Sequence, residues 1–154
     1  MLYVYPDFPK PTKGKNAILL RYGAYGDHIV ASCVLPYLKR DGYRITYNTT
    51  ERGFEILNHN PNIDDFWLQK TDEIPNAGLD RHWEDISTGF DKVVNLNQSI
   101  EVECVSVQFR DHYTLKERRE KFDINFYENN VKKAGYEFVP PVKGELYFTS
   151  LNID

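Results

Sequence analysis

A short segment near the start of the chain gathers residue types that can do chemistry: Arg21, Gly23, Gly26, Asp27 and His28. Glycines let the backbone turn tightly and approach a ligand closely. A carboxylate such as that of Asp27 can take a proton from a hydroxyl group that lies within a hydrogen-bond reach of ~2.6–3.2 Å. The segment therefore predicts a binding turn, a site for general base catalysis, or both.

Asp27 also has a purely structural interpretation. Aspartate is favoured at the N-cap of a helix, where its side chain accepts a backbone N–H bond and contributes ~1 kcal/mol. A carboxylate there argues against a dinucleotide site, because it competes for the N–H groups that would bind a pyrophosphate. Arg21 also stands where the dinucleotide fingerprint has its first glycine, and Glu51 is a weak candidate for its acidic ribose ligand. From the residues alone, both roles of Asp27 stay open.

The elements that must position this segment are a strand before it and a helix after it. Ala17–Arg21 begins with an apolar run, as in a buried strand. The apolar positions after Asp27 repeat every three to four residues, which predicts a helix over Asp27–Arg40. We expect Pro36 to kink this helix, because an interior proline removes a backbone hydrogen bond. In open α/β sheets, ligands bind at such strand ends.

Strands and helices alternate along the rest of the chain. The further predicted elements are strands at Arg44–Thr49, Asp65–Leu68 and Lys92–Leu96, helices at Glu51–Asn58 and Lys116–Ala134, a helical turn at 83–88, an ambiguous segment at 100–109, and a strand or linker at 145–149. Residues 1–16 hold three prolines and are predicted to be an extended arm. The alternation favours an α/β fold with a parallel sheet covered on both faces. We predict that Ala17–Arg21 is a central strand, paired with Arg44–Thr49 on one side and Lys92–Leu96 on the other.

The composition indicates a globular protein and argues against several partner classes. The chain has 154 residues, of which 41% are hydrophobic, and a formal net charge of −4. It lacks the clustered Lys and Arg of a nucleic-acid site, so no nucleic-acid partner is expected. Two cysteines, Cys33 and Cys104, are too few for a disulfide framework or a zinc site. No signal peptide is predicted, and the expected location is cytoplasmic.

Several motifs, in order, resemble the heptosyltransferase-like glycosyltransferases of family 9. They are Arg21–Asp27 (RYGAYGD) followed by Pro36–Lys39, Ile45–Phe54, Asn60–Asp64 (NPNID) and Phe90–Leu96 (FDKVVNL). The resemblance covers residues 17–100 well and residues 101–139 more loosely. It implies the GT-B fold, in which two Rossmann-like halves face each other across a cleft. The N-terminal half binds the acceptor, and the C-terminal half binds the nucleotide-sugar donor.

The resemblance also implies a mechanism and a place for this chain in it. Family 9 transfer is inverting and needs no metal or other cofactor, and its catalytic base is the aspartate of the G-x-x-G-D turn, which maps onto Asp27. Residues 17–143 would be a Rossmann-like, three-layer acceptor domain, and 144–154 the start of the connector to a donor-binding half beyond Asp154. The acceptor would be a sugar or a glycolipid, which can bring the protein to a membrane surface. Such a truncated chain is expected to be inactive alone.

Eight residues are candidates for substrate binding under this interpretation. They are Arg21, Gly23, Gly26, His28, Thr49, Glu51, Asn97 and Ser99. The polar ones follow strands and could instead cap helices, and His28 could instead be a partly exposed helix residue or tune Asp27. Two rival functions remain: a non-catalytic Rossmann-like module that binds a nucleotide or phosphate, and an assembly domain. Self-association is expected if the surface that meets the second half is uncovered.

Overall fold

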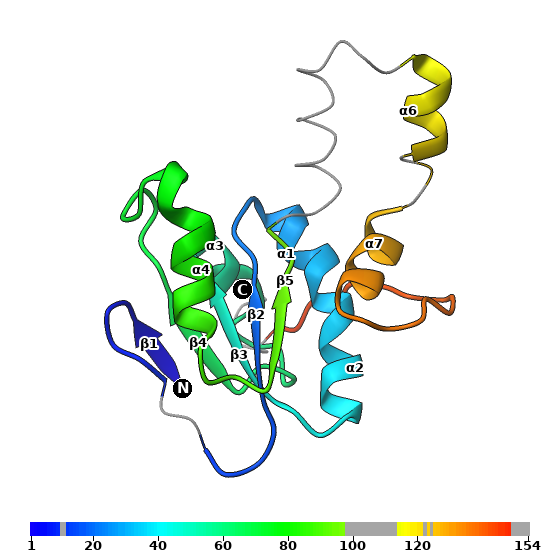
Figure 1. Ribbon diagram of the computed structural model, residues 1–154. Coiled ribbons are helices and arrows are strands. Elements are labelled where there is room, and N and C mark those ends of the chain that lie inside the picture. Colours follow the sequence, from blue (N-terminus) through cyan, green and yellow to red (C-terminus); the bar gives the residue numbers. More distant parts are fainter. Residues whose placement is uncertain (10–11, 98–113, 122, 124, 149–154) are drawn as a thin grey trace.

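The computed structural model describes residues 1–9, 12–97, 114–121, 123 and 125–148 (Figure 1). The described strands form one parallel sheet in the order β1-β4-β3-β2-β5. Their bounds are β1 Leu2–Val4, β2 Asn16–Leu20, β3 Arg44–Thr49, β4 Asp65–Leu68 and β5 Lys92–Asn95. The predicted pairings are confirmed, because β2 lies between β3 and β5, although β3 is the middle strand of the five.

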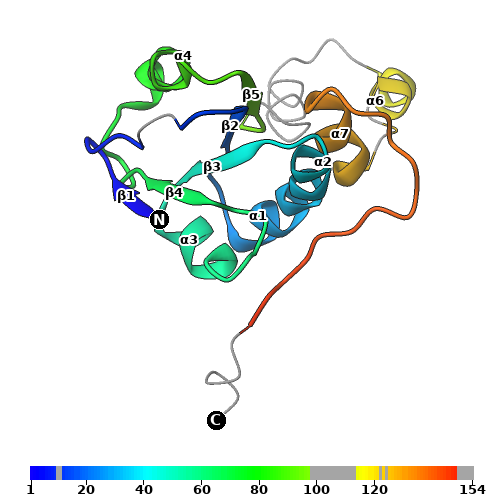
Figure 2. The ribbon, with the colours of Figure 1, turned by 90° about the horizontal axis from the view of Figure 1, so that it is seen from below.

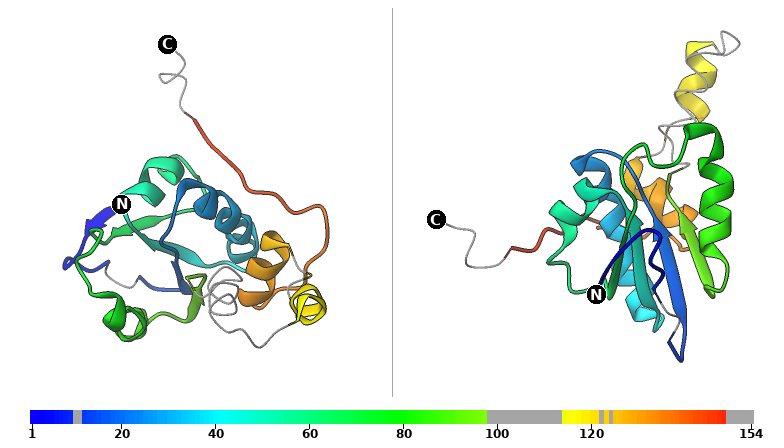
Figure 3. Two further views of the ribbon diagram at one scale, coloured as in Figure 1. Left: turned by 90° about the horizontal axis from the view of Figure 1, so that it is seen from above. Right: turned by 90° about the vertical axis from the view of Figure 1, so that its left-hand side faces the viewer.

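Helices cover both faces of the sheet, as Figure 2 shows. The described helices are α1 Tyr25–Ala31, α2 Leu35–Arg40, α3 Glu51–Leu57, α4 Leu79–Ser87, α6 Leu115–Lys121 and α7 Phe126–Lys133, with 3₁₀ turns η1 Ser32–Val34 and η2 Asn76–Gly78. Helices α1, α2 and α3 lie on one face, with α7 beside α1 and α2, and α4 lies on the other (Figures 2 and 3). The three-layer α/β prediction is therefore confirmed.

The alternation of side chains along β2 builds the two halves of the core. Ala17 and Leu19 pack in the cluster that contains residues of α2 and α7, whereas Ile18 and Leu20 pack against the α4 side. All five residues of β2 are buried, which explains the continuous apolar run from Ala17 to Leu20. Trp67 and Trp83 are both buried in the α4-side cluster.

The N-terminal arm differs from the prediction. Leu2–Val4 forms the edge strand β1, which pairs in parallel with Phe66–Leu68 of β4. The segment is only three residues long and stands close to Pro6, so the sequence shows no strand pattern there. Its conformation depends on the free edge of β4, which offers backbone hydrogen bonds to any extended segment beside it.

The first helix is divided where the sequence predicts one kinked helix. It begins at Tyr25 rather than Asp27, and η1 separates α1 from α2. Pro36 then lies in the first turn of α2, where a backbone N–H is not needed for an intrahelical bond. The break therefore precedes the proline and accommodates it.

The predicted helix Lys116–Ala134 is also two helices, α6 and α7. Asn125 caps α7, its side-chain oxygen accepting a hydrogen bond from Glu128 N at 2.8 Å, so a new helix starts there. The predicted turn at 83–88 is the end of the longer helix α4, and 145–148 form neither helix nor strand. The ambiguous segment 100–109 lies outside the described residues.

Two aspartates of the recognised motifs have structural roles at the strand entrances. Asp64 Oδ2 accepts a hydrogen bond from Ile45 N at 2.7 Å and pairs with Lys39 Nζ. Asp91 Oδ2 accepts one from Asn16 N at 2.7 Å. These side chains satisfy backbone N–H groups where β3 and β2 begin, which sets the register of the strands that lead to the candidate site.

The chain after α7 crosses η1 and then runs away from the sheet (Figure 3). Glu145 N donates a hydrogen bond to Ser32 Oγ at 3.1 Å. A Cβ at Gly144 would collide with the carbonyl group of Ile29, so only glycine lets the chain pass so close to α1. The segment that resembles a connector is thus attached directly to the helix that carries Asp27.

Gly53→Ala is expected to destabilise the fold, although alanine is favoured over glycine in a helix by ~1 kcal/mol. A Cβ at Gly53 would collide with Thr49 Oγ1 and lie 2.7 Å from His28 Cε1, so α3 could not stay in place. Overpacking of this kind costs ~1–3 kcal/mol, measurable by urea unfolding. Gly26→Ala is the control, because its Cβ would meet no heavy atom within 4 Å. Equal stability of Gly53→Ala and the unmodified chain would contradict this packing.

Candidate functional site

Asp27 lies in the first turn of α1, at the carboxyl end of β2. Ala24 is the N-cap, and Asp27 is the third residue of the helix, so the interpretation of Asp27 as the N-cap is wrong. Asp27 Oδ2 accepts a hydrogen bond from Ala24 N at 2.8 Å. The carboxylate thus reaches back to the cap residue, as the acidic partner of a capping box does.

Arg21 holds the second oxygen of the same carboxylate. Its Nη2 lies 2.9 Å from Asp27 Oδ1, and its Nη1 donates to the backbone oxygen of Leu96 at 2.6 Å. Arg21 is buried at the end of β2, whereas the Asp27 side chain is 22% exposed. The ion pair with the buried Arg21 therefore fixes the orientation of the Asp27 carboxylate, while part of the Asp27 side chain stays exposed to solvent.

Gly23 makes room for this carboxylate. Its φ of +135° lies in a region that favours glycine, and a Cβ at Gly23 would collide with Asp27 Oδ2. The backbone conformation of Gly23 and its lack of a Cβ therefore allow Asp27 to occupy this position. From the sequence, Gly23 is a candidate for substrate binding. The geometry shows that Gly23 shapes the turn and leaves space for the Asp27 carboxylate.

An open cleft borders Asp27, and we call it the Asp27 cleft. Its volume is about 280 Å³, and its lining residues are Arg21, Ala24, Gly26, Asp27, Val30, Phe126 and Asn130. Gly26 contributes a stretch of wall without a side chain. The structure thus brings together Asp27, Arg21 and Gly26 from the predicted set, at the edge of the sheet where α/β proteins bind ligands.

Phe126 and Asn130 belong to this cleft and were missed by the sequence analysis. Both lie on α7, far from Asp27 along the chain. Helix α7 packs against α1 and η1, with Val131 and Ala134 in the core. No pattern in the sequence around Phe126 or Asn130 marks them as cleft residues, because they come close to Asp27 only when α7 packs beside α1.

A second, larger hollow lies on the other side of the turn. It has a volume of about 410 Å³ and lies between Tyr22 and Gly23 on one side and Thr50, Arg52 and the 69–79 segment on the other. Glu51 is exposed beside it, its Oε2 accepting a hydrogen bond from Thr71 Oγ1 at 3.4 Å. Glu51 therefore lies near this hollow and is absent from the lining of the Asp27 cleft.

Two predicted substrate ligands, His28 and Thr49, have no exposed surface. His28 Nδ1 lies 3.0 Å from Tyr47 Oη, inside the α1–β3 contact. Thr49 lies under Gly53 of α3. Neither side chain reaches the surface in this conformation, so their substrate-binding roles stay predictions that the geometry does not support. The interpretation of His28 as a partly exposed helix residue is wrong. The reason is the helix period: His28 shares with Ala31 the face of α1 that packs on the sheet.

Asn97 joins two strand ends beneath the turn. Its Oδ1 accepts a hydrogen bond from Tyr22 N at 2.6 Å, and its side chain is largely buried. It therefore ties the end of β5 to the turn that follows β2. Ser99, the other candidate after this strand, lies outside the described residues.

Acid is expected to destabilise the protein through His28. Burial, and then the charge of Arg21, lower the pKa of His28 from 6.5 to about 4. The unfolded chain therefore binds a proton that the folded chain rejects, and stability is lost as the pH falls from 6.5 towards 4. The loss attributable to His28 is about 3 kcal/mol.

The measurement is urea unfolding across this pH range for the unmodified chain and for His28→Gln. The stability difference between the two should change by about 3 kcal/mol in favour of the variant as the pH falls. His59→Gln, at an exposed position, serves as the control and should show no such change. A constant difference for His28→Gln would show that His28 is not buried in its neutral form.

The fold is similar to that of a solved glycosyl transferase structure. The crystal structure of a glycosyl transferase family 9 protein from Veillonella parvula DSM 2008 matches with a TM-score of 0.56 and 19% sequence identity. The match covers 89% of this chain and 46% of that chain. The two proteins share a fold. The chain spans about half the length of this neighbour, whereas its sequence matches no protein-family model and no curated protein.

Within the described part of the chain, no three His, Cys, Asp or Glu side chains are grouped so that they could hold a metal ion. None of the helices described is both long and apolar enough to cross a membrane. Among the described residues that line the Asp27 cleft, Asp27 is acidic and Arg21, which pairs with it, is basic.

Proposed function

We propose that this chain is the acceptor-binding domain of an inverting, metal-independent glycosyltransferase, with Asp27 as the general base. The observation that carries the proposal is the Asp27 carboxylate, held on the wall of an open cleft at the carboxyl edge of a sheet. The fold shared with a family 9 glycosyl transferase supports it. The substrates are a nucleotide-sugar donor and a sugar or glycolipid acceptor with a free hydroxyl group.

In the proposed reaction, Asp27 takes the proton of the acceptor hydroxyl. The hydroxyl oxygen forms a bond to the anomeric carbon of the donor sugar, and the bond to the nucleoside diphosphate breaks on the opposite side. The configuration at the anomeric carbon is therefore inverted. The two contacts of Asp27, to Ala24 N and to Arg21, hold the carboxylate in one orientation. An acceptor that binds beside it would therefore have its hydroxyl group aligned with the base.

The donor would bind to a second domain. The chain covers 46% of its family 9 structural neighbour, which leaves room in such a protein for a donor-binding half. The segment at 144–148 leads away from the sheet and would be the start of the connector. A cytoplasmic enzyme that meets a glycolipid acceptor at a membrane surface is the corresponding cellular setting.

The rival function is a nucleotide- or phosphate-binding module. Phosphates bind at turns whose backbone N–H groups are free to donate. Here Ala24 N already donates to Asp27 Oδ2, and the carboxylate adds negative charge at that place. This arrangement favours a hydroxyl ligand over a phosphate.

Nucleoside diphosphates are therefore expected to bind the chain poorly. The test is a titration of isotopically labelled chain with uridine, guanosine and adenosine diphosphates, followed by amide chemical shifts. We expect no saturable shift at Gly23, Ala24 or Gly26. Saturable binding at these amides, lost when Gly26→Trp fills the cleft, would establish the module and overturn the acceptor-domain proposal.

A further inference from the structure

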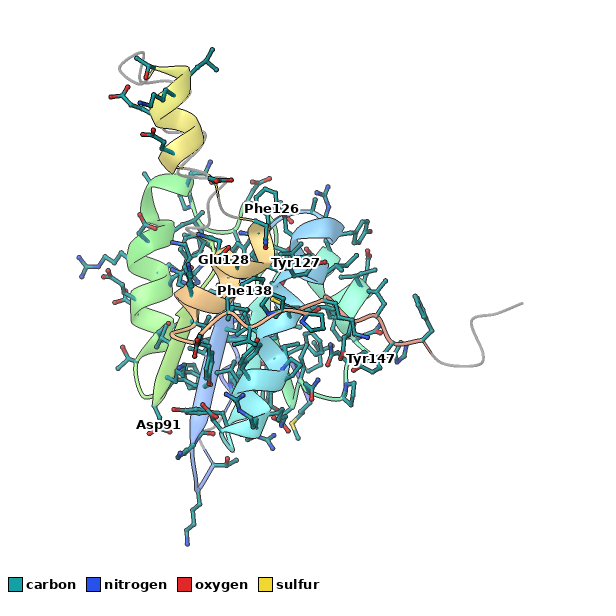
Figure 4. All side chains as sticks on the ribbon, turned by 90° about the vertical axis from the view of Figure 1, so that its right-hand side faces the viewer. Asp91, Phe126, Tyr127, Glu128, Phe138 and Tyr147 are labelled. Carbon is teal, nitrogen blue, oxygen red and sulfur yellow. The ribbon has the colours of Figure 1, made fainter. Side chains whose placement is uncertain are left out.

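Phe126 is a large apolar residue that the fold leaves uncovered. It is the first residue of α7 and is 48% exposed. The same helix places Val131 in the core, and Ala134 directly after it is also buried there, so the packing of α7 does not depend on Phe126. Figure 4 shows Phe126 at the end of α7 near α1. An exposed aromatic ring inside a cleft therefore calls for an explanation other than packing.

The position of Phe126 is set by a rigid support. Asn125 caps the helix at this residue, and Val131 anchors the next turns in the core. Helix α7 packs against α1, which carries Asp27. The ring and the carboxylate are thus held on two packed helices, which suits a binding site better than a loop does.

The Asp27 cleft has a polar and an apolar part. The carboxylate of Asp27, with Arg21 behind it and Asn130 on α7, provides the polar part. Phe126 and Val30 provide the apolar part, and Gly26 leaves the wall beside Asp27 free of a side chain. Such a lining fits a ligand with an apolar face and polar groups around its edge.

A pyranose ring has this shape, with C–H groups on its face and hydroxyl groups around its rim. An alkyl chain would cover the polar groups of Asp27 and Asn130 without offering them a hydrogen bond, which is costly in a desolvated site. A phosphate would meet the Asp27 carboxylate, which repels it and already pairs with Arg21, and an apolar ring. Of these three ligand classes, a sugar ring uses both parts of the cleft.

We propose that Phe126 is the residue that selects the acceptor, its ring stacking on the C–H face of a pyranose whose hydroxyl group points to Asp27. This inference rests on the proposed function and narrows the acceptor from any sugar or glycolipid to one that presents a pyranose ring. Phe126 is a specificity-determining residue here, whereas Asp27 is the base.

The experiment uses the isotopically labelled chain and methyl glycosides of glucose, galactose, mannose and N-acetylglucosamine as probes, with sorbitol as an acyclic polyol. At least one glycoside should shift the Gly26 amide and the Phe126 ring protons, and sorbitol should not. Phe126→Ala should weaken that glycoside about tenfold, Phe126→Leu by less, and Phe126→Trp should restore or tighten binding. Gly26→Trp should abolish it. Circular dichroism checks that each variant is folded.

The outcomes separate the two proposals. If a glycoside binds in the cleft and Phe126→Ala binds it as tightly as the unmodified chain, the stacking role is overturned and the acceptor-domain proposal stands. If no glycoside shifts a cleft residue, or sorbitol binds equally well, the pyranoside assignment is wrong. The role of Asp27 is then still judged by the turnover of Asp27→Asn in the two-domain enzyme, which does not depend on these probes.

Discussion

Replacing Asp27 with asparagine will lower the turnover of a two-domain enzyme that contains this chain by ~10²–10⁴, the usual contribution of a general base. The amide oxygen of asparagine can still accept the hydrogen bond from Ala24 N, so the helix start should be kept. The amide cannot take the acceptor proton. It also no longer neutralises the buried Arg21, so a loss of stability should accompany the loss of activity.

The measurement is release of nucleoside diphosphate under single-turnover conditions, with thermal unfolding recorded for the same samples. Asp85→Asn is a matched control, because it removes one carboxylate from α4, where the Asp85 side chain is 71% exposed. That variant should keep normal turnover. Near-normal turnover in Asp27→Asn would reduce Asp27 to a residue that only stabilises the start of α1.

The chain by itself is expected to show no sustained sugar transfer. Holding donor and acceptor in a reactive geometry can supply ~7–11 kcal/mol of a reaction barrier. In the proposed arrangement this chain holds only the acceptor and the base. The turn beside the acceptor carries the Asp27 carboxylate, which repels a departing diphosphate, so the chain offers the leaving group no favourable place in the Asp27 cleft.

The purified chain is incubated with nucleotide sugars and candidate acceptors, and the release of nucleoside diphosphate is followed. Addition of a separately produced donor-binding half should restore transfer if the two halves associate. Sustained turnover by the chain alone would show that the second half is dispensable, and the division of roles between the halves would be wrong.

Self-association stays a prediction that light scattering can check in the same preparation. The segment that leads away from the sheet exposes Leu146 and Phe148, the latter at 69%. Uncovered apolar side chains of this kind favour association when a neighbouring domain is absent.

The order of strands and helices could be predicted from the sequence because each pattern is local. The apolar run before Arg21 is typical of a strand buried on both faces, and β2 is such a strand. The predicted bounds of the strands Arg44–Thr49 and Asp65–Leu68 agree with those of β3 and β4. The glycine turn ending in Asp27 could also be recognised locally, since Gly23 is required by the backbone and by the carboxylate four residues later.

The tertiary structure alone decided which candidates face a ligand. His28 follows Asp27 directly, yet His28 packs against the sheet whereas Asp27 borders the cleft. Adjacent residues lie on different faces of a helix. The start of α1 at Tyr25 and the break at η1 decide which face of the helix each of these residues occupies. Thr49 is at a strand end, as predicted, but the close approach of α3 at Gly53 covers it.

Contacts between distant segments had no sequence signal at all. Arg21 reaches Leu96 as well as Asp27, β1 is a strand because β4 offers it an edge, and Phe126 meets the Asp27 cleft because α7 packs on α1. The sequence thus determined the fold class, the interior strand and the carboxylate at its end. The partners of that carboxylate and the walls around it were decided by packing, since burial and proximity depend on surfaces that meet only in the folded chain.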